Sequence, residues 1–164
     1  MTKFDTLKQQ VLAWAFARQI IPNAKPHSQL MKTGSELGEL LDAELKSDQP
    51  GIIDGVGDVL VTLIIYAHLK QVEFPSPDSE YMVLGLSHEK AMDVSLAYGV
   101  LVDAHRNMGQ WHVQRALDVM VRELGAYAYM RGITLETGLA AAYREIKDRK
   151  GTLLPNGCFV KESA

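Results

Sequence analysis

The hydrophobic residues of this chain recur mostly every three or four positions, the spacing that gathers side chains on one face of an α-helix. Leu7, Val11 and Trp14 begin the pattern, and Asp5 or Thr6 is the expected N-cap of the first helix. Helical spacing then continues, with interruptions, to near the end of the chain. The predicted helices cover about residues 7–18, 28–46, 52–70, 89–107, 111–131 and 135–149.

Short breaks separate these helices. Prolines interrupt the stretch IPNAKP (21–26), SDQPG (47–51) reads as a turn, and EFPSPDSE (73–80) is the most linker-like segment. The tail TLLPNGCFVK (152–161) has an Asn-Gly pair between two apolar runs, which predicts a small β-hairpin. The predicted fold class is therefore all-α with a short C-terminal hairpin, in a single domain over residues 1–164.

Part of the chain resembles another part of itself at an offset of 61 residues. GELLDAELKSDQ (38–49) aligns with GVLVDAHRNMGQ (99–110), and LIIYAHLK (63–70) aligns with LGAYAYMR (124–131) without a gap. Eight of the 38 positions from 35 to 72 are identical at this offset. The alternative is a chance match between two amphipathic hairpins of similar length.

A duplicated helical hairpin predicts a four-helix bundle, because each hairpin can cover the apolar stripe of the other. The first hairpin covers residues 28–70 and the second, degenerate one 91–131. Flanking helices lie at both ends of the chain, and residues 134–162 form a basic helix and tail.

Acidic residues interrupt the apolar surface of the first hairpin only. Glu36 and Glu39 are neighbours on one predicted helix, and Asp54 and Asp58 on the next. Their counterparts in the second hairpin are not acidic. These counterparts are Ala97, Val100, Arg115 and Val119. The difference predicts one chemical site, located in the first hairpin.

Bringing four carboxylates together needs a compensating charge. At about 4 Å and an effective dielectric constant near 20, one like-charged pair repels by roughly 4 kcal/mol. A divalent cation removes this cost, and oxygen ligands alone favour Mg²⁺, with Mn²⁺ as the alternative. Such an ion commonly also binds substrate phosphates, which indicates metal-assisted attack on a phosphate ester or anhydride. The competing interpretation is an ordinary solvated acidic face.

The two acidic segments, SELGELLDAELK and IIDGVGDVLVTLI, resemble the MazG-like superfamily of all-α nucleoside triphosphate pyrophosphohydrolases, most closely the MazG-like proteins common in phages. The end of the chain, AYREIKDRKGTLLPNGCFVKE, is also similar to the C-terminal segment of those proteins. The family pattern is ExxE followed by ExxD, which Glu36, Glu39 and Asp58 match. The expected second-helix Glu is replaced by Gly55, and Asp54 is the substitute we expect.

The resemblance implies hydrolysis of a nucleoside triphosphate to the monophosphate and pyrophosphate. Mg²⁺ would be held by Glu36, Glu39, Asp54 and Asp58, with Glu39 the preferred general base and Glu36 the other catalytic candidate. The departure at Gly55 leaves an alternative function: a catalytically impaired bundle that binds nucleotide or metal without turnover. A purely structural or partner-binding bundle is a further alternative.

Basic residues near the acids are candidates for substrate binding. Lys32 lies one turn before Glu36, where it either binds phosphate or only pairs with that Glu. The run KDRKG (147–151) either complements the dipole of the last helix or holds the triphosphate. The substrate-binding candidates are Lys32, Lys147, Arg149, Lys150 and Asn156. Trp14, Tyr66, Tyr127 and Trp111 are expected to be core residues rather than groups that stack on a base.

Composition limits the partners. The 164 residues are 47% hydrophobic and 23% charged with a net charge of −3, so no basic face for nucleic acid is expected. Cys158 is the single cysteine, and VLAWAFA (11–17) is too short to span a membrane. We therefore expect a cytoplasmic protein, and the resemblance implies a nucleoside triphosphate as its partner. A homodimer formed through the first and last helices is also expected, although the second hairpin supplies an internal partner for the first.

Overall fold

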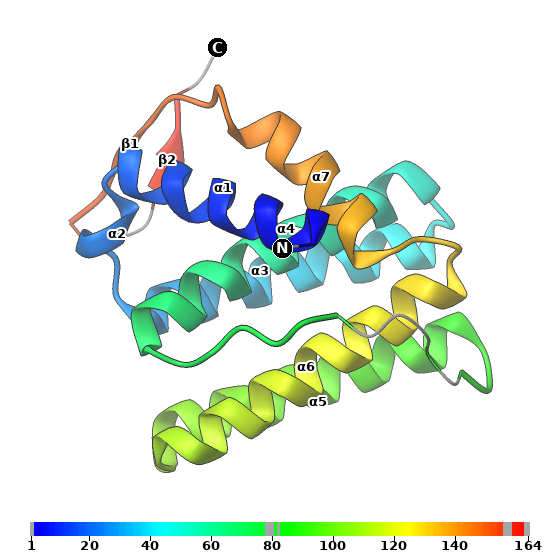
Figure 1. Ribbon diagram of the computed structural model, residues 1–164. Coiled ribbons are helices and arrows are strands. Elements are labelled where there is room, and N and C mark those ends of the chain that lie inside the picture. Colours follow the sequence, from blue (N-terminus) through cyan, green and yellow to red (C-terminus); the bar gives the residue numbers. More distant parts are fainter. Residues whose placement is uncertain (1, 78–80, 82, 156–158, 163–164) are drawn as a thin grey trace.

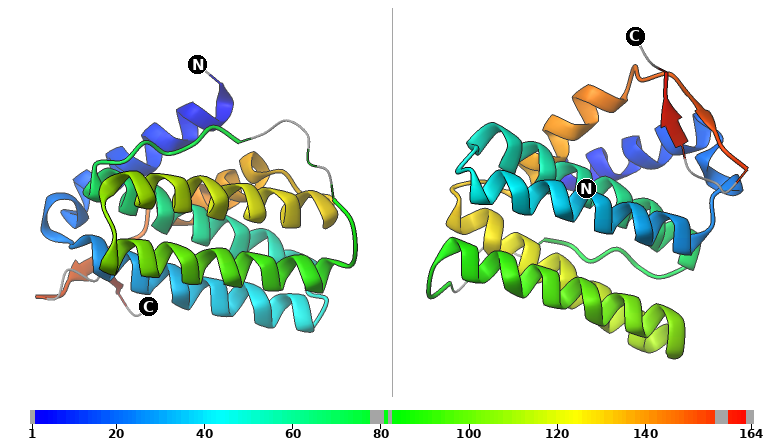
Figure 2. Two further views of the ribbon diagram at one scale, coloured as in Figure 1. Left: turned by 90° about the horizontal axis from the view of Figure 1, so that it is seen from below. Right: turned by 180° about the vertical axis from the view of Figure 1, so that it is seen from behind.

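The computed structural model describes residues 2–77, 81, 83–155 and 159–162. Its helices lie in three layers: α5 and α6 on one side, α3 and α4 in the middle, and α1 and α7 on the far side of α4 (Figures 1 and 2). The helices are α1 (Lys3–Ala17), α2 (Ile20–Asn23), α3 (Pro26–Leu45), α4 (Gln49–Lys70), α5 (Ser87–Asn107), α6 (Gln110–Met130) and α7 (Leu135–Ile146). The predicted all-α bundle of two hairpins with flanking helices is confirmed.

The two strands in the described residues form the predicted C-terminal hairpin. β1 (Gly151–Leu153) pairs with β2 (Phe159–Lys161) in antiparallel register, with Thr152 opposite Val160. The expected Asn-Gly turn lies outside the described residues. The hairpin packs on α1 through Phe159, whose ring meets the indole of Trp14 edge-on at 5.8 Å between centroids.

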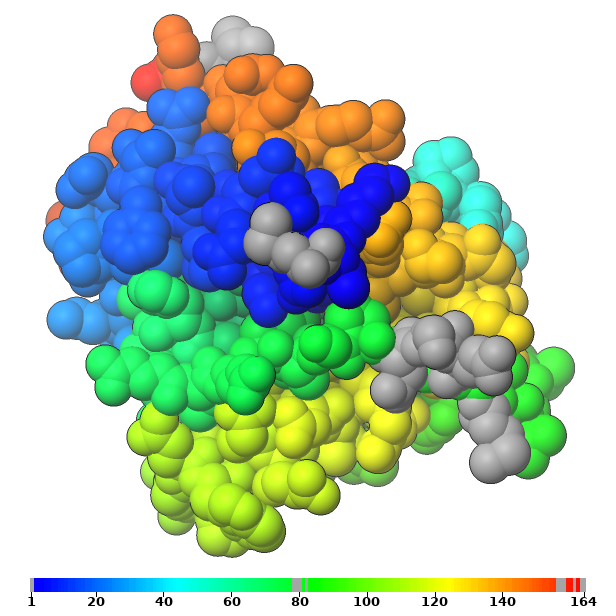
Figure 3. Space-filling view, in the orientation of Figure 1, coloured from blue at the N-terminus to red at the C-terminus, as the bar shows by residue number. Residues whose placement is uncertain are grey.

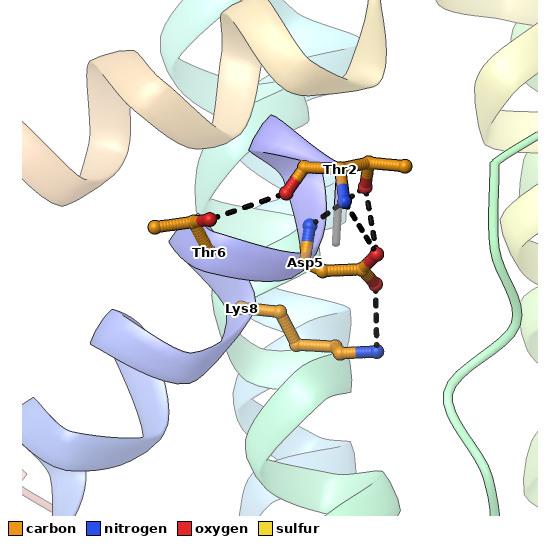
Figure 4. Close-up of polar contacts among 4 residues, drawn as sticks. All are labelled: Thr2, Asp5, Thr6 and Lys8. Atoms are coloured by element: carbon orange, nitrogen blue, oxygen red, sulfur yellow. Dashed lines mark hydrogen bonds and ion pairs between the residues drawn. The ribbon is translucent and has the colours of Figure 1, made fainter.

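The start of α1 corrects the sequence prediction. The N-cap is Thr2, neither Asp5 nor Thr6 (Figure 4). The Thr2 hydroxyl accepts the backbone N–H of Asp5 at 3.1 Å, and the Asp5 carboxylate accepts the backbone N–H of Thr2 at 3.0 Å. This capping box satisfies two N–H groups at once, so the helix begins earlier than the apolar pattern does. Asp5 is thus the third residue of the helix and the second member of the capping box.

The helix α1 buries its apolar face against the protein's own core. Phe4, Leu7 and Val11 are all buried. In the space-filling view α1 covers the surface between α7 and the segment that follows α4 (Figure 3). The face that we expected to form a homodimer is thus occupied within the chain, although the homodimer itself stays a prediction.

Three further boundaries differ from the prediction. A short helix, α2, overlaps the start of the proline-rich break, α4 begins inside the predicted turn, and α7 ends at Ile146 instead of 149. Pro50 occupies the first turn of α4, where its missing N–H costs nothing. After α7 the chain turns to enter β1, which explains the early end of that helix.

The two hairpins have the same internal spacing. Their first helices begin 61 residues apart, at Pro26 and Ser87, and their second helices begin 61 residues apart, at Gln49 and Gln110. The pattern of burial also shifts by this offset: the buried positions Leu40 and Ala43 of α3 correspond to the buried Leu101 and Ala104 of α5. The offset found in the sequence therefore also relates the two hairpins in structure.

Contacts between the hairpins are reciprocal. The Tyr66 hydroxyl lies 3.1 Å from Nδ1 of His105, and the Tyr127 hydroxyl donates to Glu44 Oε2 at 2.8 Å. At the offset of 61, Tyr66 corresponds to Tyr127 and Glu44 to His105. Gln49 likewise donates to the carbonyl of Arg131 at 2.9 Å, while Gln110 donates to that of Lys70 at 3.3 Å. The halves pack as the two subunits of a symmetric dimer do.

The central helix α4 is the most buried element. Its length and apolar composition would also suit a membrane span, but 72% of that stretch is buried inside the protein. Gly57 lets α7 approach closely, because a Cβ there would lie 2.2 Å from the carbonyl oxygen of Gly138. Helix α7 thus packs tightly over the part of α4 that carries the acids.

Candidate functional site

The four predicted ligands lie on facing turns of α3 and α4. Glu36, Glu39, Asp54 and Asp58 line a single cavity of about 240 Å³ together with Asp42 and Asp48. The short α3–α4 connection makes these helices antiparallel neighbours, which brings the two acidic pairs to one groove. The prediction that both pairs share a pocket is therefore confirmed.

The acids differ in their surroundings. Glu36 is buried, with 8% of its surface exposed, and its Oε1 lies 2.6 Å from Nζ of Lys32. Asp54 and Asp58 are half-buried, whereas Glu39 is exposed and makes no hydrogen bond or ion pair within the described part of the chain. Glu36 is thus held in place, and Glu39 is free to reorient.

The pKa of Asp58 shows how closely the negative charges are gathered. Burial, followed by the charges of Asp54 and Glu36, raises it from an ordinary value of 3.8 to about 7, although the charge of Arg149 lowers it. The pKa of Asp54 is also raised, first by burial and then by the charge of Glu145. Excess negative charge at this site is the condition that a cation would relieve.

The carboxylates are not arranged as a finished metal centre. Among the described residues, no three His, Cys, Asp or Glu side chains lie close enough together to hold a metal ion. The donor set still suits a hard cation, because six carboxylates line one cavity without sulfur or imidazole. Binding would require rotation of carboxylate side chains toward one another.

The geometry explains why position 55 is a glycine. A Cβ on Gly55 would lie 2.9 Å from Cβ and 3.0 Å from Cα of Leu40 on α3. A glutamate there would collide with the backbone of the neighbouring helix. Close packing of α3 and α4 therefore excludes a glutamate at position 55, whereas the carboxylate of Asp54, one position earlier, lines the cavity.

A second cavity of about 220 Å³ adjoins the first and shares Glu36 and Asp58 as its wall. Lys32 and Arg149 also line it, so both candidates lie beside the acids. Nη2 of Arg149 lies 3.5 Å from Oε2 of Glu145. The remaining wall is largely apolar or aromatic and comes from α1, α2, α4, α7 and the tail: Trp14, Ile20, Val61, Ile65, Ile146 and Phe159.

The other basic candidates are placed differently. Lys147 and Lys150 are exposed and do not line either cavity, and Nζ of Lys147 lies 3.8 Å from Asp148. Asn156 lies outside the described residues. Of the basic run, the structure brings only Arg149 to the acids, because the helix ends at Ile146 and the chain turns there.

The sequence alone did not indicate several residues of this site. The charge of Glu145, on α7, raises the pKa of Asp58, and Gln29 and Thr62 line the second cavity. Trp14, Tyr66 and Tyr127 are buried, as predicted for core residues, but the indole of Trp14 also forms part of the cavity wall. The prediction that Trp111 is a core residue is wrong, because this residue lies in the first turn of α6 and is 68% exposed. The useful signal in the sequence was the polar Gln29 on the apolar face of α3, two turns before Glu36.

Comparisons with models of protein families, with curated proteins and with solved structures find no significant match to this chain.

Proposed function

We propose that this protein is a Mg²⁺-dependent nucleoside triphosphate pyrophosphohydrolase, which converts a (d)NTP and water into the (d)NMP and pyrophosphate. The observation that carries the proposal is the shared wall of Glu36 and Asp58 between an acid-lined cavity and one that contains Lys32 and Arg149. Acidic and basic side chains that lie side by side suit a polyphosphate, which a metal ion on the acids would bind from one side and the basic groups from the other.

Glu36, Glu39, Asp54 and Asp58 would hold Mg²⁺, or Mn²⁺ as the alternative. When bound, the ion would polarise a phosphate oxygen and lower the pKa of a water molecule. The resemblance of the two acidic segments to MazG-like pyrophosphohydrolases supports this assignment, with Asp54 in place of the family glutamate.

The chain's own residues position the substrate and move the proton. Lys32 and Arg149 neutralise phosphate oxygens, and the guanidinium of Arg149 suits a bidentate contact. Both are held near the acids by ion pairs with Glu36 and Glu145, which a bound triphosphate would partly replace. Glu39 is exposed and makes no hydrogen bond or ion pair within the described residues, so it would be available to take a proton from the attacking water instead of binding the ion.

The test measures pyrophosphate release from a panel of NTPs and dNTPs, with Mg²⁺ and with EDTA. We expect release with Mg²⁺ only, and a loss of at least 100-fold in Glu39→Gln, in keeping with the usual size of a general-base contribution. Asp103→Asn is the matched control, because Asp103 is an exposed acid on the second hairpin, away from both cavities. Equal rates in Glu39→Gln and the wild type would contradict the assignment.

A second function is favoured by one observation, the absence of a ready three-carboxylate group among the described residues. A bundle that binds nucleotide or metal without hydrolysis would show a Mg²⁺-dependent rise in Tm but no pyrophosphate release. That result would support the catalytically impaired alternative. A purely structural bundle would show neither effect. Cytoplasmic location stays a prediction.

A further inference from the structure

One side of helix α5 is apolar and exposed to solvent. Met92, Leu96 and Val100 follow one another at four-residue spacing, so they share this side of the helix, and they are 70%, 69% and 49% exposed. Seen from below, α5 and α6 lie in front of the rest of the protein, with no other described element over them (Figure 2, left). Single exposed apolar residues are ordinary, but a row of three on one helix marks a surface that binds a partner.

The first hairpin shows that the fold does not require this row. At the offset of 61 residues, Leu96 corresponds to Ser35 and Val100 to Glu39, and all four positions are exposed. The same surface is therefore polar in the first hairpin, where Glu39 lines the acid-lined cavity, and apolar in the second. Because Leu96 and Val100 do not pack on the protein's own core, their apolar character indicates contact with a molecule outside the chain.

The exposed charges of the two helices differ in sign. Those of α5 are mostly acidic and those of α6 are both basic: Glu89, Asp93 and Asp103 with Arg106 on α5, and Arg115 and Arg122 on α6. The contacts of the α6 arginines within the chain are long, since Nη1 of Arg115 lies 3.8 Å from Asp118 and Nε of Arg122 lies 3.6 Å from Glu123. These guanidinium groups can therefore turn to acids on another molecule.

We propose that this outer face of α5 and α6 is the interface of a homodimer. A two-fold axis parallel to the two helices places α5 of each copy against α6 of the other, so that opposite charges meet on both sides of the axis. The helices are antiparallel and joined at residues 108–109, so residues nearly equally far from this turn lie at about the same level. Asp103 of one copy is then level with Arg115 of the other.

The charges favour a second copy over other partners of an apolar row. Pairing of α5 with α5 would gather acids from both copies, and a membrane surface that contains anionic lipid would repel them. The interface also differs from the apolar face of α1, which is buried within the chain, and none of the residues named above for it lines either of the two cavities at the acids. The proposal is therefore independent of the proposed function.

Sedimentation equilibrium of the full chain over a range of protein concentrations measures association, and we expect a monomer–dimer equilibrium. Leu96→Ser combined with Val100→Glu gives α5 the residues of the first hairpin. This double variant should raise the dissociation constant roughly 10-fold or more, because two apolar side chains no longer become buried. Leu45→Ser is the matched control, since it removes an exposed leucine from the end of α3, and it should change the dissociation constant by less than about 2-fold.

An exchange of charges tests how the two copies are arranged. Asp103→Arg and Arg115→Asp should each weaken the dimer, because each brings like charges together across the interface. Both positions are exposed, so the fold should tolerate either change. The variant with both changes restores opposite charges and should regain most of the wild-type affinity. No recovery in that variant would overturn the pairing of α5 with α6.

Three other results would overturn the interface. The first is a wild-type chain that stays monomeric at every concentration, and the second is a dimer that Leu96→Ser with Val100→Glu does not weaken. The third is binding of the wild type to vesicles of phosphatidylcholine and phosphatidylserine that the same double variant abolishes, because the row would then contact lipid instead of a second copy.

Discussion

Asp58 is the residue at which burial and neighbouring charge act most strongly together. Its folded pKa of about 7 lies above its ordinary value of 3.8. Between these values the folded chain binds more protons than the unfolded chain, so the free energy of unfolding falls as the pH rises from about 4 to about 7. The full shift corresponds to ~4 kcal/mol, an upper bound because the side chain is partly exposed to solvent.

We therefore predict that, in EDTA, urea denaturation at pH 5 and pH 8 will show a smaller loss of stability for Asp58→Asn than for the wild type. The amide keeps the shape of the side chain and removes its charge. His105, whose pKa is lowered by burial, acts in the opposite direction but is present in both proteins. A parallel pH dependence in the two proteins would contradict the assignment of this charge to Asp58.

Some residues of the candidate site could be predicted from the sequence, and others could not. The carboxylates were predictable, because acids inside an apolar helical face conflict with burial unless they have a function. Trp14, Glu145 and Phe159 come from three separate elements and meet only through long-range packing. No local spacing encodes such a meeting, so these residues could not be found from periodicity.

At the level of elements, the helices themselves were predictable and their ends were less so. The spacing of apolar residues predicted every long helix, but it does not predict the helix caps. The capping box at Thr2 lies outside the apolar pattern, and the end of α7 depends on the tail turning toward β1. Helix ends respond to local hydrogen bonds and tertiary contacts, which the spacing of apolar residues does not record.

A prediction at the level of elements concerns the contact between α4 and α7. Gly57→Ala should lower the free energy of unfolding by about 2–3 kcal/mol, because the added Cβ would overlap the carbonyl oxygen of Gly138 and force the helices apart. Urea denaturation measures this change.

Gly99→Ala is the matched control on α5. A Cβ there meets nothing within 4 Å, so the substitution should raise stability by about 0.5–1 kcal/mol through helix propensity alone. Similar effects of the two substitutions would show that α7 does not pack on α4 as described.

For the whole molecule, the reciprocal contacts between the hairpins are the defining feature. Each half offers a buried tyrosine to the end of the first helix of the other half. The two contacts differ in chemistry. Glu44 is charged, and although burial alone would raise its pKa, hydrogen bonds from Ser87 and Tyr127 bring that pKa below its ordinary value. Burial lowers the pKa of His105, which favours the neutral imidazole, so the partner of Tyr66 is uncharged.

This difference predicts unequal costs for removing the two hydroxyls. Tyr127→Phe should lower the free energy of unfolding by about 1.5–3 kcal/mol, the range for a hydrogen bond to a charged group, and Tyr66→Phe by about 0.5–1.5 kcal/mol. Tyr143→Phe is the control, since the Tyr143 hydroxyl makes no hydrogen bond within the described residues, and it should change stability by less than about 0.5 kcal/mol. Equal costs at Tyr66 and Tyr127 would contradict this account.

The segment between α4 and α5 keeps both halves on one chain, and this has a consequence for association. Subunits of a dimer separate on dilution, whereas two halves joined in one chain stay together at any protein concentration. The acid-bearing hairpin is therefore always paired with the second hairpin. The second hairpin, which lacks the four acids, supplies a buried face to the first.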